Sequence, residues 1–357
     1  MQVSRLVLRN LRNLVEVALE PAPGLNLLLG PNGAGKTSVL EGLHLLAYGR
    51  SFRGRVRDGL VRTGQEALEV FAEWQPGQGT PRRAGLRHSG ARWEARLDGQ
   101  AVAHLGELCA AFMVVTFEPG SHALVSGGGE PRRRFVDWGL FHVEQDFLPV
   151  WRRYSRALRQ RNALLKAGAP GAQLSAWDQE LAGAGEELTW RRARYLDRLQ
   201  ERLAGIGAEL APALGAMSLA FEPGWRRNDL SLADALAVAR DRDQALGHTT
   251  VGPHRADWRL GLAGKGRGEA LSRGQAKLAA LACLFAQAED CAAERGDWPV
   301  VALDDLASEL DLAHRGRVLA FLARTPAQVF ITGTDPLPEG GQERVFHVEQ
   351  GRVAPAA

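Results

Sequence analysis

The sequence predicts an α/β lobe built on a mixed sheet, together with a second lobe that is mainly α-helical. Apolar and polar residues alternate with a period of two over most of the first thirty residues, which is the pattern of short strands. A glycine-rich turn and an amphipathic helix follow directly. From Pro131 to about Gly215 apolar residues recur at helical spacing, and short buried strands return near the end of the chain. This order places a helical lobe between two parts of an α/β lobe.

The α/β lobe is expected to comprise residues 1–117 and 296–357. Its first helix is expected from Lys36 to Ala47, where Val39, Leu40 and Leu43 share one face. Its second helix is expected at 312–324. The strands of this lobe are expected where residues alternate or form short apolar runs bounded by Pro and Gly, at 3–8, 14–19, 25–29, 68–74, 84–88, 92–97, 112–117, 300–303 and 329–332.

The second lobe is expected to comprise residues 118–295 and to be mostly helical. No heptad persists over several repeats, so the helices are expected to form a short arm without an extended coiled coil. Its helices are expected at 132–142, 146–166, 175–203 and 272–294, and its strands at 216–222 and 258–262.

Composition is that of an ordinary globular chain. Hydrophobic residues make up 45% and charged residues 24% of the 357 residues, and the net charge is only +3. The longest apolar run, 278–286, is far shorter than the ~20 residues that cross a bilayer. Three scattered cysteines predict neither disulfides nor a zinc site. We therefore expect a soluble cytoplasmic protein that does not act at a membrane.

A phosphate-binding motif lies between the third expected strand and the first expected helix. Residues 30–37 match the pattern G-x-x-x-x-G-K-[ST], in which glycines let successive backbone N–H groups surround a phosphate at a helix N-terminus. Lys36 is expected to reach the β- and γ-phosphates of a nucleotide, and the Thr37 hydroxyl to bind Mg²⁺. The whole set expected to bind the nucleotide is Gly30, Pro31, Asn32, Gly33, Ala34, Gly35, Lys36 and Thr37.

Two carboxylates follow the apolar run 300–303. Asp304 stands where a parallel sheet would bring it to the metal, so it is expected to bind Mg²⁺ directly or through water. Asp305 points elsewhere and is expected to polarise the attacking water as a general base. A pair of surface aspartates capping a loop is the structural alternative.

The segment before the last long helix resembles the signature motif of ABC-type ATPases. Ser272 and Gly274 would act there on the nucleotide of a second protomer, although Ser272 is equally suited to cap the helix. Ser308 and Asp311 lie in a segment that resembles the D-loop of the same class. The resemblance places Ser272, Arg273, Ser308 and Asp311 at a dimer interface.

Taken together, the motifs resemble the RecF family of bacterial recombination proteins, and they extend over nearly the whole chain. The phosphate loop is one of the segments that carry the resemblance. The others are Leu8 to Asn13, Gly49 to Arg53, Phe117 to Pro119, Glu130 to Asp137, Thr250 to Asp257 and Asp304 to Asp311, which includes the carboxylate pair.

This resemblance implies an SMC-like, ABC-type ATPase head that dimerises on ATP and binds DNA at gaps, where single strand meets duplex. The implied partners are RecR, acting with RecO to load RecA, and the implied location is the nucleoid. The same resemblance adds Arg12 and Gln275 to the nucleotide-binding residues. Three departures from the wider ABC pattern predict slow turnover: Asp305 replaces a glutamate, Arg273 replaces a glycine, and neither a Q-loop glutamine nor a switch histidine is evident.

Three basic segments are candidates for DNA contact. Arg53, Arg55 and Arg57 share a glycine-containing loop, where a solvated loop is the alternative. Arg132, Arg133 and Arg134 stand at the start of a helix, where positive charge is unfavourable without an anion or an ion pair. The arm adds Arg152, Arg153, Arg156, Arg159 and Arg161. His254 and Arg255 are candidates for the dimer or DNA surface, with a turn-stabilising pair as the alternative.

Three other functions fit parts of the sequence. The nucleotide-binding subunit of a transporter would need the missing Q-loop glutamine and switch histidine. A metabolic P-loop kinase would need no signature helix. A scaffold that holds a structural nucleotide would need no turnover.

Overall fold

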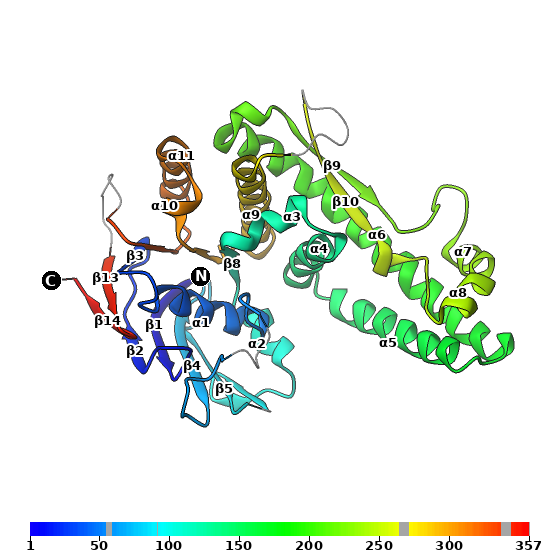
Figure 1. Cartoon of the computed structure of the whole chain (residues 1–357), viewed down its shortest axis with the longest axis horizontal. Helices are drawn as coiled ribbons and strands as arrows, with labels where there is room; N and C mark the ends of the chain where they lie inside the picture. Colours follow the sequence, from blue (N-terminus) through cyan, green and yellow to red (C-terminus); the bar gives the residue numbers. More distant parts are fainter. Residues whose placement is uncertain (55–58, 91, 264–270, 337–343, 357) are drawn as a thin grey trace. The chain divides into compact units, whose positions relative to one another are not determined.

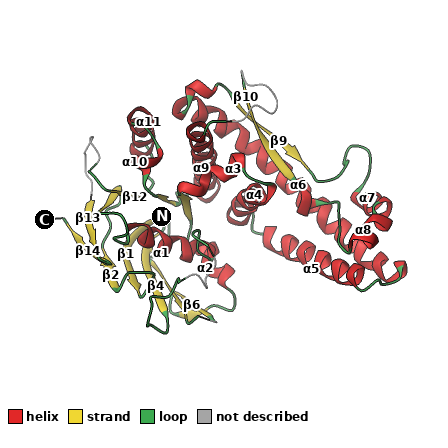
Figure 2. Ribbon diagram, in the orientation of Figure 1, coloured by secondary structure: helices red, strands yellow, loops and turns green. Residues whose placement is uncertain are grey.

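The computed structural model describes all residues except 55–58, 91, 264–270, 337–343 and 357. The chain forms two compact units. The α/β unit comprises Met1–Ser121 and Leu281–Ala357, and the helical unit comprises His122–Ala280. The α/β fold with a mixed sheet and a helical second part is confirmed (Figures 1 and 2).

The central sheet of the α/β unit is mixed. Its strands pair in parallel except at one edge, where β13 and β14 form an antiparallel hairpin. In spatial order they are β14 (Arg352–Pro355), β13 (Arg344–Glu349), β3 (Leu25–Leu29), β12 (Val329–Gly333), β11 (Val300–Leu303) and β8 (Val114–Phe117). Strands β8, β11 and β12 are buried along their whole length, which explains their uninterrupted apolar runs.

The second sheet of this unit is antiparallel throughout. In spatial order its strands are β2 (Glu16–Leu19), β1 (Gln2–Arg9), β4 (Leu68–Gln75), β5 (Arg82–His88), β6 (Trp93–Leu97) and β7 (Gln100–Ala101). Burial alternates residue by residue along β4, as expected for a sheet that packs on one face only. The α-helices that lie wholly within the unit are α1 (Lys36–Tyr48), α2 (Leu105–Ala111), α10 (Leu306–Glu309) and α11 (Leu312–Ala323).

The helical unit is built around two long helices that lie side by side, α5 (Phe147–Lys166) and α6 (Gly171–Leu210) (Figure 2). Helix α6 has 40 residues and is about 60 Å long at 1.5 Å per residue. It begins directly after Pro170 and is longer at both ends than the sequence predicted. The other elements are α3 (Ala123–Ser126), α4 (Gly129–Val143), α7 (Leu232–Val238), α8 (Arg240–Leu246), and the hairpin of β9 (Met217–Glu222) and β10 (Asp257–Leu262).

The boundary between the units falls inside helix α9 (Arg273–Arg295), whereas the sequence placed it at 295/296. Residues after Ala280 belong to the α/β unit because their side chains enter its core. Phe285 is fully buried and stacks on Phe321 of α11 with ring centroids 5.2 Å apart. Over the described part of the chain, no helix has both the length and the apolar character needed to cross a membrane.

Candidate nucleotide site

The phosphate-binding loop, residues 30–37, connects β3 to α1. Gly33 and Gly35 have φ angles of 77° and 118°, which side-chain-bearing residues rarely adopt. Gly35 precedes the first turn of α1, and no described side chain caps that turn. Backbone N–H groups at such a helix start attract anions, helped by the helix dipole. The loop therefore has the conformation that holds a phosphate.

Two neighbouring segments support this loop from outside. The backbone N–H of Gly351, in the β13–β14 turn, donates to the Ala34 carbonyl at 2.9 Å, and the Asn13 side chain donates to the Gly33 carbonyl at 2.9 Å. A Cβ atom at Gly30 would lie 2.0 Å from the Val348 carbonyl oxygen, so only glycine fits there. The loop conformation thus depends on the end of the chain. Asn13 was not predicted as a site residue. The signal in the sequence was its position directly after Arg12, which was predicted to bind the nucleotide.

Lys36 is the first residue of α1, and only 8% of it is exposed. Its ammonium group donates to the carbonyls of Gly30 at 2.6 Å and Pro31 at 2.9 Å, so the side chain folds over its own loop. Burial lowers the pKa of this ammonium group, while the charges of Asp305 and Asp304 oppose that shift. The ammonium group is therefore held beside the loop and faces two carboxylates.

Asp304 follows β11 and lies next to Thr37. The Thr37 hydroxyl donates to the two carboxylate oxygens at 2.9 and 3.1 Å, and the Thr332 hydroxyl donates to one of them at 2.8 Å. Asp304 is only 4% exposed, and this burial raises the pKa of its carboxyl group, as does the charge of Asp305. The structure therefore brings the two expected Mg²⁺ ligands into contact.

The oxygen atoms of Thr37 and Asp304 fit Mg²⁺. Mg²⁺ prefers oxygen donors and is usually held by one or two carboxylates together with the phosphates of a substrate. Within the described residues, no group of three or more His, Cys, Asp or Glu side chains is placed to bind a metal by itself. A metal at Asp304 would accordingly depend on the nucleotide as well as on the protein.

Asp305 adopts a left-handed backbone conformation, with φ of 51°, and it precedes α10. Its N–H donates to the Thr332 hydroxyl at 2.8 Å. Thr332, at the end of β12, thus contacts both members of the carboxylate pair and was not predicted from the sequence. The only signal was a hydroxyl side chain at the end of a buried strand.

The signature and D-loop residues have local structural roles. The Ser272 N–H donates to the Gln275 side chain at 3.1 Å, and the Gln275 N–H donates to the Ser272 hydroxyl at 3.2 Å, which forms a capping box at the start of α9. Arg273 and Gly274 are exposed in its first turn. Asp311 caps α11 by accepting from the His314 N–H at 2.9 Å, a contact that lowers the pKa of Asp311. Ser308 is exposed, and its N–H donates to the Asp305 carbonyl at 3.0 Å.

Comparison with known proteins agrees with this architecture. Residues 2–350 match the model of the RecF/RecN/SMC N-terminal domain. The DNA replication and repair protein RecF of Stenotrophomonas maltophilia is 63% identical over 99% of each chain, and that of Shewanella denitrificans is 38% identical over 99% of each chain. The chain belongs to the RecF family.

The solved structures similar to this RecF-family chain support the same fold. A structure described as the recombination mediator protein RecF-ATP in the RecFOR pathway is 26% identical, with a TM-score of 0.90, and covers 100% of this chain and 98% of that chain. An SmcHead bound to the C-winged helix domain of ScpA is 17% identical, with a TM-score of 0.62, over 100% of this chain and 98% of that one. The ABC-type ATPase fold is therefore established.

Arg12 of the RecF-family chain binds a glutamate of α1. Its guanidinium group donates to both carboxylate oxygens of the buried Glu41, at 3.0 and 2.8 Å. Arg53 lies 4.0 Å from the same carboxylate, and its charge opposes the burial that raises the pKa of Asp304. Arg53 is thus electrostatically coupled to the nucleotide site. Arg55 and Arg57 lie outside the described residues.

The arginine triplet of the helical unit is largely committed to internal contacts. Arg132 donates to both oxygens of Asp257, at 2.6 and 2.8 Å, and Arg133 donates to the Ala256 carbonyl at 2.8 Å. Arg134 is exposed and pairs with Glu130. The sequence left two explanations for positive charge at the start of α4, contact with DNA or an internal ion pair. The ion pair with the Asp257 carboxylate accounts for Arg132.

Two further basic residues of this unit make internal contacts. Arg161 is fully buried and donates to Asp178 and Asp243, each at 2.6 Å, so it is not available to DNA. His254 accepts from the Tyr154 hydroxyl at 2.7 Å, because its other ring nitrogen lies 3.0 Å from the Thr249 carbonyl and must donate to it. These contacts stabilise the turn that contains His254, in agreement with the alternative that His254 has a structural role there.

Proposed function

We propose that this chain is an ATP-dependent DNA repair protein that binds and slowly hydrolyses ATP with Mg²⁺. The observation that carries the proposal is the contact of Thr37 and Asp304 beside the phosphate-binding loop. The loop N–H groups and Lys36 bind the phosphates, while Thr37 and Asp304 hold the metal. Mg²⁺ neutralises charge on the phosphates and helps to orient them.

Asp305 is the proposed general base. Its N–H donates to Thr332, and its backbone has the left-handed conformation at the start of α10. A carboxylate placed next to a water molecule accepts its proton as the water attacks the γ-phosphate in line. Because an aspartate is one methylene shorter than a glutamate, its reach to that water is shorter and turnover is slow.

ATP is proposed to drive formation of a homodimer, with Ser272 and Gly274 of one protomer completing the nucleotide site of the other. Their exposure at the start of α9 supports this role, as does the exposure of Arg273, Ser308 and Asp311. Gln275 is proposed to act there by holding Ser272 in place. Arg12 is proposed to act on the nucleotide site indirectly, through Glu41 of α1.

The dimer is proposed to bind DNA at gaps and to act with RecR and RecO in loading RecA. The solved relative described as a recombination mediator of the RecFOR pathway supports these partners. Among the predicted DNA residues, the exposed Arg53 and Arg134 are the better candidates, because Arg132 and Arg133 make internal bonds. Arg55 and Arg57 remain proposed DNA contacts from the sequence alone. The proposed location is the cytoplasm, on the nucleoid.

The test is the mass of the protein in solution, measured by light scattering with ATP, with ADP and with a gapped duplex. We expect the parent to be a monomer that dimerises only with ATP. The variants Lys36→Met and Ser272→Arg should remain monomeric under all conditions. Lys166→Met, which changes an exposed lysine at the end of α5, is the matched control and should dimerise normally. If the parent hydrolyses ATP while it stays monomeric, the composite site is wrong.

A further inference from the structure

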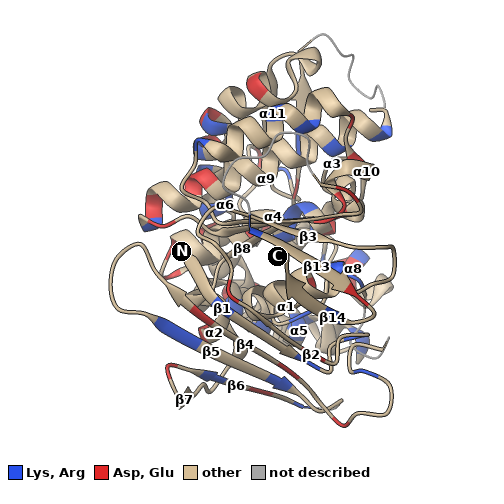
Figure 3. Ribbon diagram, turned by 90° about the vertical axis from the view of Figure 1, so that its left-hand side faces the viewer, with Lys and Arg blue, Asp and Glu red and all other residues tan. Residues whose placement is uncertain are grey.

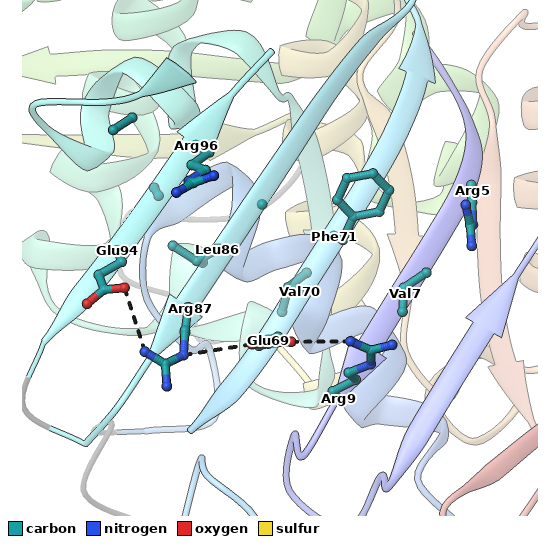
Figure 4. A pocket seen from close by; sticks show the side chains of 13 residues that line it. Arg5, Val7, Arg9, Glu69, Val70, Phe71, Leu86, Arg87, Glu94 and Arg96 are labelled. Atoms are coloured by element: carbon teal, nitrogen blue, oxygen red, sulfur yellow. Dashed lines mark ion pairs between the residues drawn. The ribbon is translucent and has the colours of Figure 1, made fainter. Parts of the chain in front are cut away.

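The strands of the antiparallel sheet contain both basic and acidic residues (Figure 3). One cross-strand row alternates in sign over five strands, because the register places each residue opposite its ionic partner. The nitrogen–oxygen distances along it are 2.8, 3.6, 3.7 and 3.7 Å. In spatial order the row is Glu16, Arg9, Glu69, Arg87 and Glu94. Its carboxylates are therefore already paired with arginines (Figure 4).

A hollow lies beside this charged row. The register aligns Val7, Phe71, Gly85 and Arg96 on β1, β4, β5 and β6, so an aliphatic and an aromatic side chain are followed by a glycine. The hollow has a volume of about 710 Å³, and Figure 4 shows Phe71 and Val7 on neighbouring strands beside it. Phe71 is half-buried.

Gly85 creates the space in the middle of this hollow. A Cβ atom built on Gly85 would meet no atom within 4 Å, so neither the packing nor a left-handed backbone requires glycine there. Glycine inside a strand weakens the strand, and it is commonly found where a ligand or another backbone approaches closely. The missing side chain is thus better explained by an occupant of the hollow than by the fold of the sheet.

The lining of the hollow has an excess of positive charge. It contains four arginines and two glutamates. The glutamates, Glu69 and Glu94, pair with Arg9 and Arg87. The register places Glu73 opposite Arg5, but among the described residues neither Arg5 nor Arg96 has a carboxylate within ion-pair distance. The two unpaired guanidinium groups come from strands on opposite sides of Phe71, so they attract negative charge on both sides of an apolar centre.

We propose that this hollow is a docking site for an acidic segment of a partner protein, whose central apolar side chain lies over Gly85 and against Phe71. Strands β1 and β6 are three strand spacings apart, or about 14 Å at ~4.8 Å each, which an extended peptide spans in about four residues. The segment therefore carries acidic residues roughly two positions before and two after the apolar residue. A nucleic acid backbone fits less well, because its sugars and phosphates offer no apolar side chain to the aliphatic and aromatic centre formed by Val7 and Phe71.

The test uses a fluorescein-labelled peptide, Glu-Ala-Phe-Ala-Glu flanked by glycines, and fluorescence anisotropy with the full chain and no nucleotide. We expect saturable binding that weakens with salt and at least tenfold weaker binding when both glutamates are replaced by glutamine. Gly85→Val fills the hollow with a residue that strands favour and should weaken binding at least tenfold without lowering the melting temperature. Arg96→Glu should act similarly.

The matched control is Arg352→Glu, which reverses the charge of an exposed arginine on the other sheet and should bind the peptide like the parent. Absence of binding by the parent, or equal binding by the parent and Gly85→Val, would overturn the proposal. It would also be overturned if a labelled oligonucleotide bound this face and Gly85→Val abolished that binding instead. The peptide assay contains neither ATP nor DNA, so its outcome is independent of the proposed ATPase.

Discussion

The Thr37 hydroxyl lies 2.9 Å from a carboxylate oxygen of Asp304, although 267 positions separate the two residues in the sequence. Thr332, on the neighbouring strand β12, contacts the same carboxylate. Both hydroxyl groups donate, so they compensate part of the cost of burying a negative charge, but burial still leaves the pKa of Asp304 raised. The site therefore holds a carboxylate whose ionised form is unfavourable when no cation is bound, as expected of a metal ligand.

Asp304→Asn is expected to make the protein without ligands more stable and unable to bind Mg²⁺-ATP. Because the pKa of Asp304 is raised in the folded state, its ionised form destabilises the fold above the pKa of the unfolded chain. The gain in melting temperature should thus be larger at pH 7 than at pH 4. Thermal unfolding at both pH values, together with calorimetric titration of Mg²⁺-ATP, measures the two effects, and an equal gain at both pH values would contradict the assignment.

Gly30→Ala is expected to destabilise the protein and abolish nucleotide binding, because the new Cβ would lie 2.0 Å from the Val348 carbonyl oxygen. Overpacking of this kind typically costs ~1–3 kcal/mol or more. Gly24→Ala is the matched control, since no atom lies within 4 Å of a Cβ there and φ is not positive. Urea unfolding measures both variants, and similar stabilities would show that the β13–β14 hairpin can move away.

Ser272→Asp separates the capping role of Ser272 from its proposed role in the dimer. Aspartate caps helices about as well as serine, so this variant should unfold like the parent, whereas Ser272→Ala should lose ~1 kcal/mol. The added negative charge should repel the γ-phosphate of the partner's ATP and prevent dimerisation. Sedimentation with ATP provides the readout. Normal dimerisation of Ser272→Asp would restrict Ser272 to the cap.

The His254 contacts predict a pH-dependent stability of the helical unit. Burial, which disfavours the charged imidazolium, lowers the pKa of His254 from 6.5 to about 4. Protonation would also break the hydrogen bond that its ring accepts from Tyr154. The folded state thus binds fewer protons than the unfolded state, and stability should fall as the pH drops from 6.5 towards 4, by on the order of 3 kcal/mol. Denaturation of the parent and of His254→Gln at several pH values measures this effect. The stability of the variant should depend less on pH than that of the parent. Parallel curves would show that His254 does not titrate.

The sequence analysis predicted the parts of the nucleotide site that lie in one continuous motif. The loop, Lys36 and Thr37 are adjacent in the chain, so the spacing of one motif predicted them. Asp304 was predicted because it directly follows an apolar strand. Thr332 and Asn13 were missed because their roles depend on which strands and loops become neighbours. That information is in the pairing of β11 with β12, which no local pattern encodes.

The arginine triplet shows the same limit for charge. The sequence correctly identified an unfavourable concentration of positive charge at the start of a helix. It did not identify the compensating residue, because Asp257 lies 125 positions from Arg132 and reaches it only through the β9–β10 hairpin. The boundary inside α9 was missed for a related reason: a continuous helix gives no signal where its packing partners change.

The order of strands in the central sheet has a consequence for biosynthesis. Strand β3 ends at Leu29, and its two neighbours, β12 and β13, begin at Val329 and Arg344. A ribosome that adds ~5–20 residues per second needs roughly 15 to 60 s to reach β12. During that interval the apolar β3 of the nascent chain has no sheet partner, so we expect chaperones to protect it until translation is nearly finished.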